Sequence, residues 1–77
     1  MAKIDPSEFL DAIADAIDGV EKDDLLLSMN LKDIPNWDSL AKLSVVAELE
    51  ERFEADLGLA DLAQCETLGD LHQRVAG

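Results

Sequence analysis

The stretch that decides the fold is residues 38–57, with the sequence DSLAKLSVVAELEERFEADL. Its apolar side chains recur at steps of three and four residues, which is the spacing of one face of an α-helix. Asp38 suits the N-cap, because its carboxylate can accept hydrogen bonds from the unpaired N–H groups of the first turn. We therefore predict a helix from Ser39 to about Asp56. Its predicted core stripe is Leu43, Val46, Leu49, Phe53 and Leu57.

The face opposite the core stripe is expected to meet solvent. With about 100° of rotation per residue, six side chains are predicted to lie on it: Ala41, Ser44, Glu48, Glu51, Arg52 and Ala55. Leu40 and Ala47 lie at the border between the two faces. We expect these two side chains to be partly exposed apolar contacts.

A second helical pattern precedes this stretch. Asp5 can cap a helix that starts at Pro6, and proline suits the first turn of a helix. Gly19 is the predicted stop of this helix. The apolar stripe of this helix is predicted to be Phe9, Ile13, Ile17 and Val20.

Two shorter patterns follow the central stretch. Gly58 interrupts the helical period, and residues 59–63 suffice for one short helix. Thr67 can cap a last helix, with Asp70 three places on as in a capping box. No segment shows the sustained alternation of a β-strand. The sequence thus predicts an all-α fold, a small four-helix bundle of three main helices and one short helix.

The first loop, residues 20–37, is long and rich in hydrophobic side chains. Long connections in compact domains usually have a function or pack on something. We expect this loop to be pinned across the bundle, with a short helical turn near Asp23 to Met29. Pro35 disfavours helix at Ile34, and Trp37 is expected to anchor the loop.

The charge balance narrows the classes of partner. Among 77 residues, 18 are acidic and six are basic, which gives a net charge of -12 at pH 7. Binding to nucleic acid or to an anionic membrane surface is driven by Lys and Arg, so we expect neither partner. The length allows one small domain over residues 1–77, which we expect to be a monomer.

The cysteine and histidine counts exclude other classes of site. Cys65 is the only cysteine and His72 the only histidine, so neither an internal disulfide nor a zinc site is expected. Cys65 is interpreted as a small buried hydrophobe. The chain shows neither a signal sequence nor a stretch that could span a bilayer. We therefore expect a reducing, cytoplasmic setting.

Ordinary catalysis lacks the necessary side chains. His72 is predicted to be a surface residue with no nucleophile in reach. Glu50 and Glu51 are adjacent, so on a helix they point apart and do not form a pair of carboxylates for acid and base catalysis. No glycine-rich phosphate loop or calcium loop is present. We predict that the chain is not an enzyme and has neither a catalytic residue nor a metal site.

Ser39 is the side chain that could carry chemistry of another kind. At the start of a helix, its hydroxyl would lie beside unpaired N–H groups and the positive end of the helix dipole. This environment favours a phosphate ester. The alternative interpretation is a helix start with no further role.

Three motifs together resemble the acyl carrier protein family over nearly the whole chain. Asp38-Ser39-Leu40 matches the family's attachment motif. Leu49-Glu50-Glu51-Arg52-Phe53 matches the acids and phenylalanine later in the same helix, and Thr67-Leu68-Gly69-Asp70 matches the opening of the last helix. The family also shares the small acidic four-helix bundle and the long first loop.

The resemblance implies a carrier with 4′-phosphopantetheine attached covalently to Ser39. The arm would hold acyl or aminoacyl intermediates as thioesters, in pathways such as fatty acid or polyketide biosynthesis. The implied partners are a phosphopantetheinyl transferase, a loading ligase or acyltransferase, and a downstream synthase or transferase. Two residue sets follow from it. Partner docking is implied for Asp38, Leu40, Ala47, Glu48, Glu50 and Glu51. Candidates to line a shelter for the acyl chain are Leu43, Val46, Phe53, Leu57, Leu68 and Leu71, whose other interpretation is ordinary packing.

The sequence departs from fatty-acid carriers near Ser39. Many of those have a glycine in the approach and more acids early in the helix, whereas this chain has Pro35-Asn36-Trp37 before the motif and Lys42 after it. We therefore expect a stand-alone carrier of a specialised pathway, with its own set of partners. Two alternatives remain: an acidic interaction module that is never modified, and a carrier-like bundle with a structural role in a larger complex.

Overall fold

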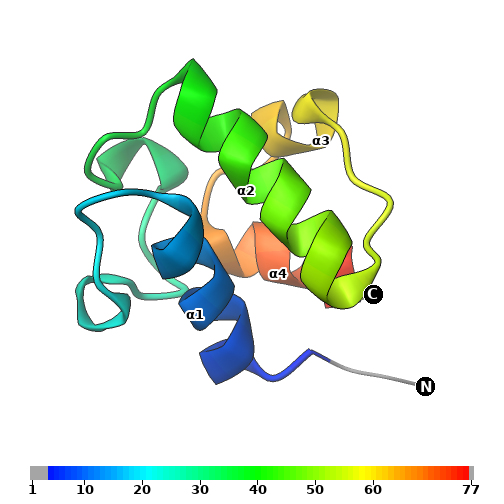
Figure 1. Cartoon of the computed structure of the whole chain (residues 1–77), viewed down its shortest axis with the longest axis horizontal. Helices are drawn as coiled ribbons and strands as arrows, with labels where there is room; N and C mark the ends of the chain where they lie inside the picture. The colour runs from blue at the N-terminus through cyan, green and yellow to red at the C-terminus, as the bar shows by residue number, and fades with distance from the viewer. Residues whose placement is uncertain (1–3, 77) are drawn as a thin grey trace.

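The computed structural model describes residues 4–76. Its helices are α1 (Pro6–Ala16), α2 (Ser39–Phe53), α3 (Leu59–Ala63) and α4 (Leu68–Ala76). The first loop contains two single turns of 3₁₀ helix, η1 (Lys22–Asp24) and η2 (Leu31–Asp33). In Figure 1, α2 runs diagonally between α1 on one side and α3 on the other. The fold is thus all-α, with three main helices, one short helix and a long first loop, as the sequence predicts.

The predicted N-caps of two main helices are confirmed. The carboxylate of Asp5 accepts a hydrogen bond from the N–H of Ser7 at 2.8 Å. The carboxylate of Asp38 accepts one from the N–H of Ala41, also at 2.8 Å. Each bond satisfies a backbone donor that has no partner within its own helix. The side chain that caps the start of α2 is therefore that of Asp38.

The predicted helix ends need correction. α2 ends at Phe53 rather than about Asp56, because Glu54 adopts a left-handed conformation with φ 55° that breaks the helical path. α1 ends at Ala16, with Ile17 already extended. Gly19 lies in the turn that follows, where its φ of 81° suits glycine.

The predicted core stripe of α2 is confirmed in part: Leu49 and Leu57 are buried and Val46 and Phe53 pack against the core, but Leu43 is not in the core. The buried side chains of α2 are Ala41, Val45 and Leu49. Leu43 was expected in the core but is 52% exposed, and Ala41 was expected in solvent but is 6% exposed. Ala41, Val45 and Leu49 lie one turn apart on a single face. Leu43 is turned away from it, whereas Val46 is half-buried at its edge.

The rest of the core comes from every element and from the first loop. The largest fully buried side chains are Phe9, Ile13, Val45, Leu49, Leu68 and Leu71. Leu25, Leu31 and Ile34 of the loop are also buried, so the loop packs on the bundle. Trp37 is half-buried and packs against the same core, in agreement with its predicted role as an anchor.

Backbone hydrogen bonds fasten the loop to the start of α4. The N–H of Leu31 donates to the carbonyl of Glu66 at 2.9 Å, and the N–H of Leu68 donates to the carbonyl of Met29 at 3.1 Å. The N–H of Gly69 donates to the carbonyl of Leu27 at 2.7 Å. A Cβ at position 69 would lie 3.1 Å from that oxygen, which explains the glycine in the Thr67-Leu68-Gly69-Asp70 motif. The helical turn predicted near Asp23 to Met29 is found at the start of that range as η1, and a second turn, η2, follows it.

A further contact connects the entry of α2 to the end of α1. Asn36, with φ 62°, donates from its side-chain amide to the carbonyl of Asp18 at 2.9 Å. Asparagine tolerates the left-handed region better than most residues. The loop is therefore held just before Trp37 and Asp38 by the turn that follows α1. None of the helices within residues 4–76 is long and apolar enough to cross a membrane.

Candidate functional site

Ser39 is the first residue of α2 and is exposed. The side chain that caps the helix belongs to Asp38, so the hydroxyl of Ser39 is not needed for the cap. Within residues 4–76 no hydrogen bond engages that hydroxyl. The serine thus combines an accessible oxygen with a helix start that another residue holds in place.

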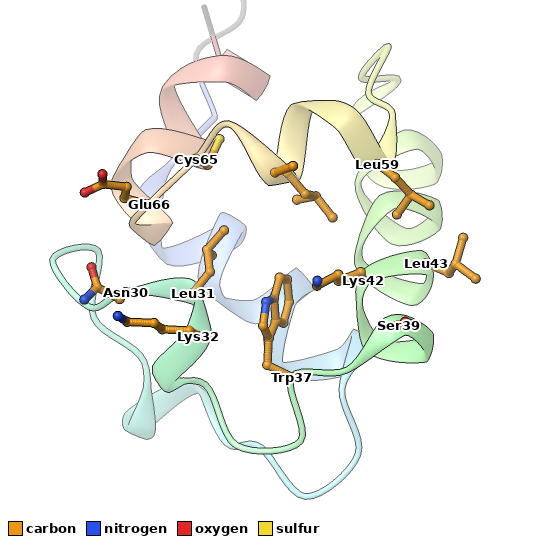
Figure 2. A pocket seen from close by; sticks show the side chains of 12 residues that line it. Asn30, Leu31, Lys32, Trp37, Ser39, Lys42, Leu43, Leu59, Cys65 and Glu66 are labelled. Atoms are coloured by element: carbon orange, nitrogen blue, oxygen red, sulfur yellow. The ribbon is translucent and has the colours of Figure 1, made fainter.

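A cavity of about 620 Å³ opens beside Ser39. It lies between α2, α3 and the first loop, and Figure 2 shows Trp37 in the middle of its opening. Its lining is Asn30, Leu31, Lys32, Trp37, Ser39, Lys42, Leu43, Leu59, Leu62, Ala63, Cys65 and Glu66. This volume and mostly apolar lining are typical of a site that accepts a small organic group.

The two lysines at this cavity differ from the other Lys and Arg side chains that the structure describes, because those are paired with carboxylates. Lys22 pairs with Asp11 at 3.5 Å, Arg74 pairs with Asp61 at 2.7 Å, and Arg52 pairs with both Asp15 and Glu48. The hydrogen bond that Arg52 donates to the carboxylate of Asp15 is the main reason that the pKa of Arg52 is raised. Lys32 and Lys42 both line the cavity. Neither forms an ion pair with any residue that the structure describes.

The residues predicted to dock a partner lie mostly on the exposed surface of α2. Leu40 is 72% exposed, and Ala47, Glu50 and Glu51 are exposed further along the helix. Glu48 differs, because it is half-buried and accepts a hydrogen bond from Arg52. Its charge is therefore largely committed within the molecule.

The residues predicted to line a shelter divide into two groups. Leu43 lines the cavity beside Ser39. The others, Val46, Phe53, Leu57, Leu68 and Leu71, pack in or against the core and are not part of this lining. Sequence analysis missed the lining from the loop and from α3, notably Leu31, Leu59 and Leu62. The many hydrophobic side chains of the loop were the available signal. They indicated that the loop packs on the bundle, but they did not indicate which of those side chains face a cavity.

The side chains of His72 and Cys65 are both at least partly buried and packed within the fold. His72 was predicted to lie on the surface but is half-buried. Its Nε2 lies 2.7 Å from the carbonyl oxygen of Ile4, and its ring meets Phe9 edge-on at 5.1 Å. The buried position of Cys65 is confirmed, and burial is the main reason that the pKa of its thiol is raised.

Comparison with protein families gives a match over residues 7–75 to the family described as Phosphopantetheine attachment site. The chain belongs to this family. It is therefore a phosphopantetheine-binding carrier domain, of a family that carries groups rather than catalyses reactions. A carrier domain implies modification by a phosphopantetheinyl transferase and interaction with biosynthetic enzymes. The search of curated proteins and the search of solved structures each found no match to the chain.

The residues around Ser39 fit 4′-phosphopantetheine, the cofactor that the family implies. An alcohol oxygen is the atom needed for a phosphate ester, and the hydroxyl of Ser39 is exposed. The start of α2 favours a phosphate group through its unpaired N–H groups and dipole. The cavity alongside has a volume suited to a small organic group.

Proposed function

We propose that the carrier domain bears its arm on Ser39 and presents acyl or aminoacyl groups to partner biosynthetic enzymes. The observation that carries the proposal is the exposed hydroxyl of Ser39 at the start of α2, beside a cavity of about 620 Å³. The arm, when bound, supplies a terminal thiol that holds the acyl group as a thioester. The chain's own residues supply attachment, position and recognition.

Attachment at Ser39 is a substitution at phosphorus. The Oγ of Ser39 gives up its proton and forms the new O–P bond, while the diphosphate bond of coenzyme A breaks and adenosine 3′,5′-bisphosphate leaves. The transferase catalyses this exchange, so Ser39 needs no activating base within the carrier. Asp38 contributes by holding the first turn of α2 through its bond to the N–H of Ala41. The exposed oxygen is thereby presented from a backbone position that the cap holds.

Docking is proposed for the exposed part of α2. Leu40 and Ala47 offer apolar contact, and Glu50 and Glu51 offer charge that can steer a basic partner. Asp38, which is the residue next to Ser39, belongs to the same docking surface. Glu48 has a smaller role in this proposal than the sequence suggests, because Arg52 is bound to it.

The cavity is proposed as the place where the carried group is sheltered. Leu43, Leu59 and Leu62 supply apolar contact there. Participation of the other predicted lining residues, Val46, Phe53, Leu57, Leu68 and Leu71, remains a prediction that requires the core to open. The approach Pro35-Asn36-Trp37 and the presence of Lys42 support a stand-alone carrier of a specialised pathway.

The test uses the purified chain, coenzyme A and a phosphopantetheinyl transferase of broad specificity. Intact mass is recorded for the wild type, for Ser39→Ala and for Ser44→Ala, which removes another hydroxyl of α2. The wild type and Ser44→Ala should each gain one phosphopantetheinyl group, and Ser39→Ala should gain none. An unmodified wild type would favour the interaction module that is never modified. An equal gain on Ser39→Ala would place the attachment elsewhere.

A further inference from the structure

We propose that the cavity beside Ser39 selects an acyl cargo with a free carboxylate, and that Lys32 and Lys42 recognise this negative charge. The inference rests on the proposed function, because the cargo would reach the cavity on an arm attached to Ser39. It goes further by naming the chemical class of the cargo and the two side chains that distinguish it from a neutral acyl group.

The charge distribution is the first observation. The molecule has a net charge of -12, yet the charged lining of the cavity consists of Lys32, Lys42 and Glu66. This surrounding is net positive in a strongly acidic protein. The other described cations, Lys22, Arg52 and Arg74, are each paired with a carboxylate. The two lysines without such a partner among the described residues, Lys32 and Lys42, both belong to the lining of this cavity.

The arrangement of the side chains is the second observation. Figure 2 shows Lys42 pointing from α2 toward Trp37, while Lys32 extends from the first loop on the other side of Trp37, with its ammonium group directed away from the indole at the outer rim of the cavity. Glu66 is directed away from Trp37 in the same view. Leu31, Leu59 and Leu62 contribute apolar wall to the same cavity. A carboxylate held against such a wall is less screened than one in bulk water, so its pairing with an ammonium group is stronger.

The phosphate of the arm is a second anion that could pair with a lysine. The experiment must therefore distinguish its effect from that of the carboxylate of the cargo. Lys42 lies three residues after Ser39 on the same helix, close enough to pair with a phosphate there. Lys32 belongs to η2, across the cavity from Ser39. Removing the charge of Lys32 therefore tests the cargo with least effect on the arm. Every loaded form also carries the same phosphate, so the effect of the phosphate on the cleavage rate cancels when two cargoes are compared.

The experiment compares two cargoes with the same number of non-hydrogen atoms. The transferase attaches ready-acylated arms from adipoyl-coenzyme A, whose acyl end is a carboxylate, and from 6-methylheptanoyl-coenzyme A, whose acyl end is a neutral isopropyl group. Intact mass verifies each loaded form. The rate of thioester cleavage by hydroxylamine is then measured at low and high salt for the wild type, Lys32→Met and Lys42→Met. Lys22→Met is the control, because it removes one positive charge outside the cavity.

We expect Lys32→Met to accelerate cleavage of the adipoyl thioester about fivefold at low salt, the size typical of one partly exposed ion pair. Lys42→Met should act in the same direction. Cleavage of the 6-methylheptanoyl thioester should not change, and neither should any rate in Lys22→Met. The indole N–H signal of Trp37, the only tryptophan, should shift on adipoyl loading in the wild type and shift less in Lys32→Met.

Three results would overturn the inference while leaving the proposed function intact. They are equal acceleration for both cargoes, no acceleration for either, and the same acceleration in Lys22→Met. Failure of the wild type to accept any arm, seen already in the intact mass, would instead overturn the proposed function and this inference together.

Discussion

At the scale of single residues, the site depends on a division of roles between two neighbours. Asp38 accepts the N–H of Ala41 and so holds the first turn of α2. Ser39 is thereby left with an exposed hydroxyl that no other described residue engages. A serine that served as the cap would have its oxygen occupied by the backbone. In the motif Asp38-Ser39-Leu40, the aspartate is thus explained by the cap and the serine by its free hydroxyl.

This role of Asp38 predicts a loss of stability that depends on a hydrogen-bond acceptor rather than on charge. Asp38→Ala should lower the free energy of unfolding by about 1 kcal/mol. Asp38→Asn is the matched control, because its amide oxygen can accept the same bond, and it should lose much less. Urea unfolding at 25 °C measures both. Equal losses in the two variants would indicate that the charge matters and the cap does not.

At the scale of the elements, α4 starts with the predicted capping box. The N–H of Asp70 donates to the hydroxyl of Thr67 at 3.1 Å. The carboxylate of Asp70 accepts from the N–H groups of Glu66 and Thr67 at 3.1 and 3.2 Å. These backbone bonds, first that of Thr67 and then that of Glu66, lower the pKa of Asp70 from its ordinary value.

A lowered pKa predicts a definite pH dependence. Because the folded state holds the proton of Asp70 less tightly than the unfolded state, the stabilisation is fully present above the ordinary aspartate pKa of about 3.9. It is lost as the pH falls through the lower pKa of the folded state. Asp70→Asn keeps an acceptor but does not titrate there. The Tm difference between the wild type and Asp70→Asn should therefore be constant near pH 7 and shrink below pH ~4. A difference that stays constant down to the lowest pH would contradict this explanation.

The elements also show how far sequence analysis reaches. The caps Asp5, Asp38 and Thr67 were predictable, because each is satisfied within a few residues of its own position. The buried face of α2 was predicted only in part, at Leu49. Large side chains such as Leu43 suggested one face, but the helix packs through Ala41 and Val45, and burial is decided by neighbouring elements. The cavity lining was missed for the same reason, because Leu31 and Leu59 come from segments far apart in sequence.

At the scale of the whole molecule, the negative charge is unevenly distributed. Glu50 and Glu51 are exposed at the later turns of α2, whereas the first turns, with Ser39 and Lys42, carry no acid. The positive surrounding of the cavity adjoins this neutral start. A partner guided by Glu50 and Glu51 would therefore meet a neutral to positive surface when it reaches Ser39.

This distribution predicts steering of a basic partner by the later turns of α2. Glu50→Lys combined with Glu51→Lys should slow association with a cognate enzyme several-fold at low salt, and the effect should fade once the Debye length drops below about 10 Å. Stopped-flow association rates across salt concentrations measure it. Glu21→Lys combined with Asp23→Lys is the control, since it makes the same charge change in the first loop. Equal slowing by both pairs would mean that net charge alone governs association.

The central claim, that Ser39 bears the arm, is tested most directly by locating the added mass. Cleavage after Lys and Arg places each of the four serines on its own peptide, and residues 33–42 contain Ser39 together with Trp37. After reaction with coenzyme A and the transferase, peptide mass spectrometry should find one phosphopantetheinyl group on residues 33–42 and none on the peptides with Ser7, Ser28 or Ser44. The claim would be contradicted by an arm on any of those three peptides, or by no arm at all.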